Sequence, residues 1–289
     1  MKVQWQVTRR KIRGLFRARA FESDETLAEA LKKPDLELGP PPPRAARPGR
    51  MNAGGISVFY GANSEHVALA EIRPPGGMRV AVAHFELLQN LKLLDVEALQ
   101  SVLVRGSYFD ASFLERLERA KFLEHLSHRI TAPVMPSDEP FDYLATQAIA
   151  DYLATKIGLD GIIYPSAQGR RGRNFTLFHH AAKVAPIELP ARTEISVSLS
   201  NYLDDGFEVD YSVWEEVQPV SEPIPPLQDS FGMPLVPSIP LPVDADFRTP
   251  TLRIDVNSIK IHHVQSVSVK TQSYNVRRYR SERRDRYVG

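Results

Sequence analysis

Two proline-dense segments place the strongest limit on how this chain can fold. Residues 39–50 read GPPPPRAARPGR, and residues 219–250 carry nine prolines in 32 positions. Proline fixes φ and lacks an amide hydrogen, so neither segment can form a helix interior or a central strand. We expect the first to be extended on the surface and the second to be a linker or an extended wrap. The chain of 289 residues then divides into a domain over 1–186 and an extension over 187–289.

Hydrophobic periodicity predicts both strands and helices in the first of these parts. The clearest helix carries an apolar stripe that includes Phe141, Leu144 and Tyr152, and it lies between Pro140 and Gly158, which are typical of a helix start and stop. Alternating apolar residues predict strands elsewhere. The set comprises strands over 57–60, 78–87, 162–164 and 175–178, and helices over 63–72, 95–104, 110–130 and 141–157. These elements indicate the α+β class.

The extension is predicted to be rich in β-structure. Strands are expected over 194–199 and 207–213, and the alternation over 251–269 favours two more. No repeat of 20 to 50 residues is evident in the sequence, so a solenoid is not expected.

The absence of cysteine excludes disulfides, thiolate zinc sites, iron–sulfur ligation and cysteine nucleophiles. It favours a reducing compartment, and no apolar run approaches the roughly 18 residues of a membrane span. We therefore expect a cytoplasmic protein without membrane contact. His125 and His128 lack the surrounding pattern of a metal site, so no metal is expected. Dinucleotide-binding GxGxxG, P-loop and serine-hydrolase motifs are absent as well.

Positive charge gathers at both ends of the chain, although the formal net charge is only +1. Residues 1–20 contain seven basic residues and no acid, and residues 277–286 contain six arginines beside tyrosines. Such ends can contact phosphates or single-stranded nucleic acid. The plainer alternative is a solvated, frayed terminus, because blocks of like charge at chain ends are commonly disordered.

Four polar residues lie at the ends of predicted strands and helices or in the loops between them, where binding and catalytic residues are often found. Arg50 closes the first proline segment, Tyr60 ends a strand, Glu71 lies near the end of a short helix, and Ser166 ends another strand. A helix dipole disfavours a carboxylate at its C-terminus by up to about 1 kcal/mol, which an arginine or a substrate cation would offset. Each residue also has a purely structural reading as a solvated, half-buried, ion-paired or turn side chain.

Six blocks of sequence carry a resemblance to a known family. They are LFRARAF (15–21), GRMNAGGISVFYGA (49–62), ALAEIRPPGG (68–77), LKLLD (91–95), FDYLATQAIADYLA (141–154) and DGIIYPSAQGRRGRNFTLF (160–178). Together and in this order they resemble the RES domain family, known as the toxin half of RES-Xre toxin-antitoxin pairs. The resemblance implies a fold similar to the ADP-ribosyltransferase toxins, with a split mixed β-sheet and flanking helices. It also implies an activity on NAD as substrate.

The resemblance assigns roles to these four polar residues. Arg50, Tyr60, Glu71 and Ser166 match the family's arginine, tyrosine, glutamate and serine. Glu71 would stabilise the oxocarbenium-like sugar that forms as nicotinamide leaves. Arg50 would hold the pyrophosphate, and Tyr60 would stack on the nicotinamide ring. Ser166 would hydrogen-bond the ribose or the nicotinamide amide.

Arg17 and Asn174 lie in matching blocks and are further candidates for contact with NAD. The leading function is cleavage of the nicotinamide–ribose bond, which would deplete NAD and arrest growth, with water or phosphate as acceptor. A second function transfers ADP-ribose to a protein. A third, of another class, is a nucleic-acid-binding or assembly module that uses the basic ends.

The expected partners follow from the same resemblance. Because the last hundred residues contain no recognisable helix-turn-helix, an Xre-type antitoxin, if the chain has one, is expected to be a separate chain. Those residues exceed a minimal RES domain, and we expect them to pack on the core or to complete a homo-oligomer. The alternatives are that they occlude the site or belong to a housekeeping or defence variant.

Overall fold

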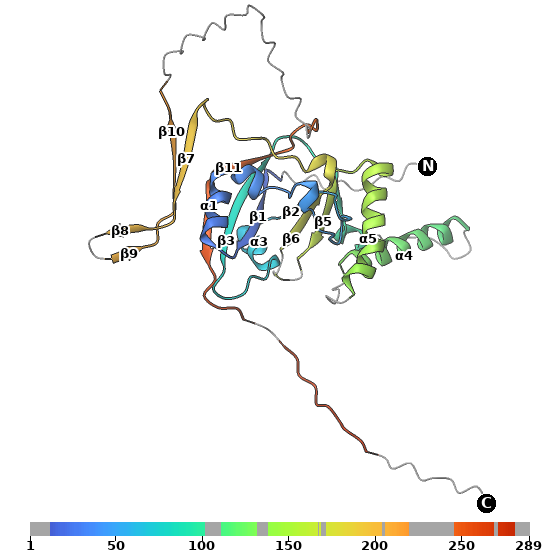
Figure 1. Cartoon of the computed structure of the whole chain (residues 1–289). Helices are drawn as coiled ribbons and strands as arrows, with labels where there is room; N and C mark the ends of the chain where they lie inside the picture. Colours follow the sequence, from blue (N-terminus) through green and yellow to red (C-terminus); the bar gives the residue numbers. More distant parts are fainter. Residues whose placement is uncertain are drawn as a thin grey trace, which may run out of the picture.

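The computed structural model (Figure 1) describes residues 12–101, 111–131, 138–166, 168, 172–203, 206–219, 246–268 and 271–280. Its centre is a seven-stranded sheet in the order β11-β3-β1-β2-β6-β5-β4. Only β4 and β5 pair in parallel, and every other neighbouring pair in this sheet is antiparallel. The strands are β1 Gly14–Phe21, β2 Phe59–Ala62, β3 Arg79–Leu87, β4 Leu93–Asp95, β5 Gly161–Pro165, β6 Arg173–Leu177 and β11 Leu252–His263. The predicted α+β class with a mixed sheet is therefore confirmed.

The sheet is almost divided between β1 and β2. A single register pair, Phe16 with Ala62, joins these two strands, whereas β1 pairs with β3 along its whole length, from Gly14 to Phe21. The strands thus form one group of three and one group of four that meet at one point. The closer likeness to ADP-ribosyltransferase toxins stays a prediction.

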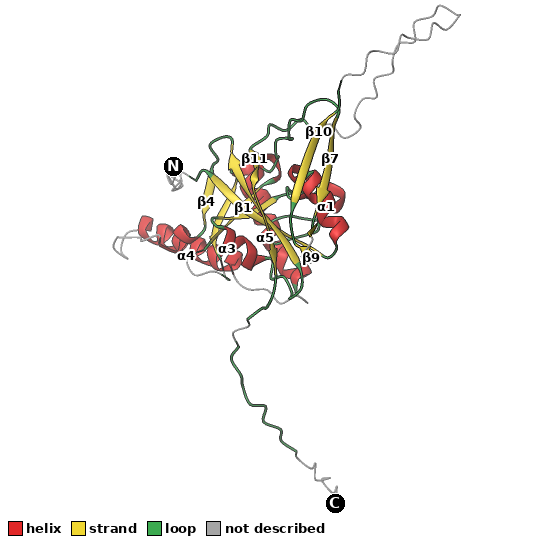
Figure 2. Cartoon of the chain, turned by 90° about the vertical axis from the view of Figure 1, so that its left-hand side faces the viewer, coloured by secondary structure: helices red, strands yellow, loops and turns green. Residues whose placement is uncertain are grey.

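Helices cover both faces of the sheet (Figures 1 and 2). On one face, α1 Asp24–Lys32 and the short α2 Pro34–Glu37 follow β1. The other face carries α3 Glu65–Glu71, α4 Ala111–Thr131 and α5 Glu139–Tyr152. The last of these, α5, continues as a π-helical turn over Leu153–Ile157. Short 3-10 turns lie at Pro43–Ala45, Glu97–Ser101 and His179–Ala181.

Local signals explain where two of these helices begin and end. Ser64 caps α3, because its Oγ accepts a hydrogen bond from the Val67 amide at 3.4 Å. Pro140 lies in the first turn of α5, and Gly158, with φ of +71°, ends the π-helical turn that follows. A left-handed residue at this position is the usual stop for a helix, so both sequence signals are confirmed.

Only part of the predicted apolar stripe of α5 faces the core. Leu153 is buried there and Ile149 packs against the same cluster, whereas Phe141 is 82% exposed and Tyr152 is 55% exposed. Thr146 and Ala150 are also buried. The helix itself is as predicted, but periodicity does not determine which of its faces packs inward.

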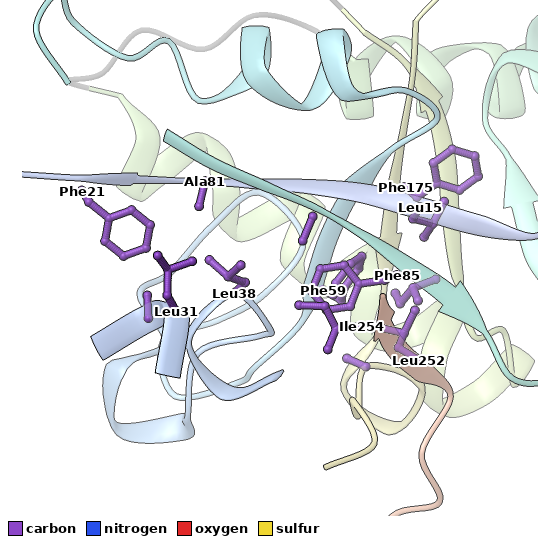
Figure 3. Close-up of a cluster of buried hydrophobic side chains, with 14 of the residues drawn as sticks. Leu15, Phe21, Leu31, Leu38, Phe59, Ala81, Phe85, Phe175, Leu252 and Ile254 are labelled. Carbon is purple, nitrogen blue, oxygen red and sulfur yellow. The ribbon is translucent and has the colours of Figure 1, made fainter. Parts of the chain in front are cut away.

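The main core lies between the sheet and α1, and the C-terminal part of the chain helps to build it (Figure 3). Leu15 and Phe59, from β1 and β2, are fully buried there, and so is Phe85 from β3. Leu252 and Ile254 from β11 enter the same cluster. The division of the chain at residue 186 stays a prediction, but β11 belongs to the main sheet.

Leu252→Ala is accordingly expected to lower the free energy of unfolding by about 2–5 kcal/mol, as truncations of fully buried leucines do. Leu252 is 0% exposed. Val256→Ala, in the same strand but at an exposed position, should change it by less than about 0.5 kcal/mol. Urea denaturation of both variants measures the difference. Equal, small effects would show that the core folds without β11.

Three sequence predictions need correction, two in the C-terminal part and one at the N-terminus. The alternation over 251–269 forms one strand, β11, with an irregularity between Asp255 and Lys260, and not two strands. The strand expected over 207–213 is replaced by two, β9 Gly206–Glu208, which pairs with β8 Asn201–Leu203, and β10 Ser212–Val217, which pairs with β7 Thr193–Ser198. A frayed terminus is wrong for residues 14–21, which form β1.

Several predictions lie outside the described residues. They concern residues 1–11, the greater part of the proline segment 219–250, and the end of the basic tail 277–286. Tyr279 in the tail and Tyr274 just before it are exposed. Among the helices that the structure describes, none is long and apolar enough to cross a membrane.

Candidate functional site

A cavity of about 220 Å³ opens where β1 and β2 diverge. It brings together four of the six candidate residues, namely Arg17 from β1, Tyr60 from β2, Glu71 from α3 and Asn174 from β6. The remaining lining residues are Phe16, Ala18, Gly61, Ala62, Ala68 and Tyr164. Residues from four strands and one helix therefore meet at the division in the sheet.

The strand register explains the polar floor of this cavity. Asn174 lies between Ala62 of β2 and Tyr164 of β5, as the partner of both. Two residues along, Thr176 lies opposite Tyr60. Since side chains alternate across a sheet, Tyr60, Asn174 and Tyr164 share one face. α3 packs against this face and brings Glu71 over it.

Glu71 is the last residue of α3, and Ser166 holds its carboxylate. The Ser166 hydroxyl donates a hydrogen bond of 2.5 Å to Glu71 Oε1, and Ser166 Oγ accepts one of 3.1 Å from the Gln168 amide. Ser166 directly follows β5 and is not among the residues that line the cavity. It therefore orients the Glu71 carboxylate from outside the cavity.

Arg17 places a desolvated guanidinium at the division between β1 and β2. Its Nη1 donates a hydrogen bond of 3.0 Å to the Tyr60 carbonyl oxygen, and its Cζ lies 5.3 Å from the centre of the Phe59 ring. Its Nε is buried and has no hydrogen-bond partner among the described residues. Burial, and then the charge of Arg19, lower the pKa of Arg17 to about 10. A cation with an unused donor at a cavity wall can bind an anionic or carbonyl group.

Tyr60 forms a fixed wall of the cavity because its hydroxyl is fully engaged. It donates a hydrogen bond of 2.8 Å to Asn52 Oδ1 and accepts one of 3.2 Å from the Met51 amide. Burial raises the pKa of Tyr60 well above its ordinary value, and the neighbouring Tyr164 adds to this effect. The Tyr60 phenol is therefore neutral at physiological pH.

Tyr164 was not a sequence candidate, although it lines the cavity. Burial raises the pKa of its phenol, and the neighbouring Thr176 hydroxyl lowers it. The charge of Glu71 raises this pKa further, whereas that of Arg50 lowers it. The signal available in the sequence was the alternation of Tyr164 with Ser166, since these two residues share one side of their strand.

Arg50 does not line the cavity. Its Nη1 donates a hydrogen bond of 2.6 Å to the Ile130 carbonyl oxygen at the end of α4. Its guanidinium lies 5.9 Å from the centre of the Tyr143 ring of α5, and its own carbonyl accepts a hydrogen bond of 2.7 Å from Thr146. Arg50 thus ties the loop before β2 to both helices, close enough to influence the titration of Tyr164.

No group of three or more histidine and carboxylate side chains that could hold a metal ion gathers within the described parts of the chain. Glu71 is the single carboxylate among the residues that line the cavity. Activity without a metal stays a prediction.

The comparisons with known proteins agree with the sequence blocks. Residues 15–198 match the family model described as RES domain. One solved structure, the M. tuberculosis MbcT-MbcA toxin-antitoxin complex, has 13% sequence identity and a TM-score of 0.32, over 60% of this chain and 78% of that chain. A TM-score this low supports no conclusion about fold or function. Among curated proteins, none matches the chain.

The matched segment covers more than half of the chain. It also contains all ten residues that line the cavity, from Phe16 to Asn174. On this evidence the chain belongs to the RES domain family.

Proposed function

We propose that this protein cleaves the bond between nicotinamide and ribose in NAD, and that the resulting loss of NAD arrests growth. The observation that carries the proposal is the Glu71 carboxylate, which a 2.5 Å hydrogen bond from Ser166 orients at a cavity that Arg17 and two tyrosines also line. A single oriented carboxylate beside aromatic walls suits a substrate that becomes more cationic at its sugar as it reacts.

In the proposed reaction the C1′–N bond breaks, and its electron pair leaves with nicotinamide as a neutral molecule. The ribose becomes an oxocarbenium-like cation, which the fixed negative charge of Glu71 stabilises. Water then adds its oxygen to C1′ and releases a proton, so that the products are ADP-ribose, nicotinamide and a proton. Phosphate as acceptor would give the corresponding sugar phosphate.

The place of Glu71 in its helix supports this role. Its carboxylate lies at the C-terminus of α3, where the helix dipole is unfavourable for a negative charge. Both the pyridinium ring of NAD and the developing sugar cation would relieve this repulsion. The attraction between Glu71 and the substrate would therefore act when the pyridinium cation binds and when positive charge develops on the sugar.

The cavity is too small for a whole dinucleotide. Sites for complete small-molecule ligands typically measure about 300–1,000 Å³, and this cavity measures about 220 Å³. We therefore assign it to the nicotinamide–ribose end, with the Tyr60 and Tyr164 rings as walls for the pyridinium cation. Arg17 would bind a negative or carbonyl group of the same end, and Arg50 would meet the pyrophosphate outside the cavity.

Transfer of ADP-ribose to a protein is the second candidate, and one surface favours it. The β10 strand exposes Trp214 on one side and Val213 and Val217 on the other, and apolar groups that gather into one exposed patch can dock a protein. The exposed stripe of α5 offers a comparable surface for an antitoxin or for a second copy of the chain. These partners remain proposals.

The test is product analysis with the purified full-length chain and NAD. Nicotinamide, free ADP-ribose and protein-bound ADP-ribose are quantified separately, with and without phosphate and cell lysate. Equal amounts of nicotinamide and free ADP-ribose are expected. Label on protein would support the transferase instead, and no consumption of NAD under any condition would overturn both enzymatic proposals.

A further inference from the structure

Asn174 presents an unused amide to the cavity. The residue is only 6% exposed, and it lines the cavity. An amide group has two donors and one acceptor, and those of Asn174 are not among the buried polar atoms without a partner in the described residues, so they are open to the cavity. A ligand in the cavity that offers complementary groups can therefore pair with them.

The neighbours of Asn174 leave room for such a ligand. On one side, its partner in the sheet is Ala62, whose side chain is a single methyl group, and on the other it is Tyr164. Beside them, the Thr176 hydroxyl is fully buried, and its closeness to the Tyr164 phenol offsets part of the rise in the pKa of that phenol. Because burial outweighs this effect and raises the pKa of Tyr164, the phenol stays protonated and can donate a hydrogen bond.

The strand geometry also indicates how far Asn174 and Tyr164 lie from the Glu71 carboxylate. Tyr164 and Ser166 are two residues apart on one side of the strand, or about 7 Å, and Ser166 contacts Glu71. A flat ring that leaves a sugar held at Glu71 would extend toward Asn174 and Tyr164. Ser166 was an alternative partner for the nicotinamide amide, but its hydroxyl donates to Glu71.

We propose that Asn174, with Tyr164 beside it, recognises the carboxamide of the nicotinamide leaving group and so selects NAD over nicotinic acid adenine dinucleotide. This inference rests on the proposed function. A carboxamide pairs with an asparagine amide through one donor and one acceptor on each side. The carboxylate of the acid analogue has acceptors only, so it would leave the Asn174 oxygen unpaired.

The experiment compares kcat/KM for the two dinucleotides in the wild type, Asn174→Ala and Asn174→Asp. The wild type should prefer NAD by at least about 100-fold. Asn174→Ala should lower kcat/KM for NAD by about 100-fold and hardly change that for the acid, so the preference collapses. Asn174→Asp should lower both and keep a strong preference, because its carboxylate repels the acid analogue. Tyr164→Phe should lower kcat/KM for NAD about tenfold, and Asn257→Ala, at an exposed position of β11, should change neither value.

Binding to the wild type separates this inference from the proposed reaction. Nicotinamide should raise the melting temperature, and nicotinic acid at the same concentration should not. If the protein cleaved no NAD but were stabilised by nicotinamide and not by nicotinic acid, the proposed nicotinamide subsite would be supported and the proposed reaction would be wrong. Equal effects of the two compounds, or a substrate preference unchanged in Asn174→Ala, would overturn the assignment of Asn174.

Discussion

Glu71→Gln should lower kcat for NAD cleavage by about 10³-fold, or ~4 kcal/mol of transition-state stabilisation. The substitution keeps the shape of the side chain and an oxygen that can accept the hydrogen bond from Ser166. It removes only the negative charge that, in the proposed reaction, would face the developing sugar cation. The melting temperature should therefore stay within about 3 °C of the wild type. Initial rates of nicotinamide release, with thermal unfolding on the same samples, measure both quantities.

Glu65→Gln is the matched control, because Glu65 lies in the first turn of the same helix. Its carboxylate pairs with Lys260 at 2.7 Å and with His262 at 3.0 Å, and it does not line the cavity. This variant should retain NAD cleavage within about twofold. If Glu71→Gln kept more than a tenth of the wild-type rate, the electrostatic role of Glu71 would be wrong.

Arg17→Met should lower kcat/KM for NAD by about 10²-fold without loss of stability. The lowered pKa of Arg17, about 10, means that burial disfavours its charged form in the folded protein. A base with a lowered folded pKa destabilises the fold at every pH below that value, and the penalty shrinks only as the pH rises above about 10. Methionine fills a similar space without the charge. At neutral pH, the melting temperature of Arg17→Met should therefore equal or exceed that of the wild type.

Arg19→Met is the control for Arg17→Met on the same strand. Arg19 is exposed and pairs with Glu37 at 2.8 Å, so its replacement should leave NAD cleavage unchanged. A variant that loses activity but gains stability is the result expected when the replaced side chain serves function and not folding. A fall of more than about 5 °C in the melting temperature of Arg17→Met would instead indicate that Arg17 serves mainly to join β1 and β2.

Local signals were sufficient for the helix that carries Glu71. The proline at position 74 ends the predicted segment 63–72, and α3 runs over Glu65–Glu71. The loop over residues 49–51 shows the opposite case. Gln147 of α5 donates a hydrogen bond of 2.8 Å to the Gly49 carbonyl oxygen, and Thr146 donates to that of Arg50. These contacts span about a hundred positions in the sequence, and they turn Thr146 and Gln147 of α5 toward the loop.

β1 and Arg17 show a second limit of local reasoning. Arginines at positions 17 and 19 interrupt the apolar residues of LFRARAF, so the segment resembles a charged terminus as much as a strand. Its burial depends on β3, more than sixty residues later, which pairs with it throughout. Whether Arg17 is solvated or faces a cavity depends on how far β1 diverges from β2. That divergence is a property of the assembled sheet.

The last strand of the sheet to be synthesised is β11, and it seals a core that begins with β1. During translation, the fully buried Leu252 leaves the ribosome long after the other six strands. Domains tend to fold as units from the N-terminus during synthesis, but here the unit is incomplete until about residue 263 has emerged. A chain of this design would therefore stay incompletely folded while nascent, and a product that ended before β11 would lack the strand that completes its core.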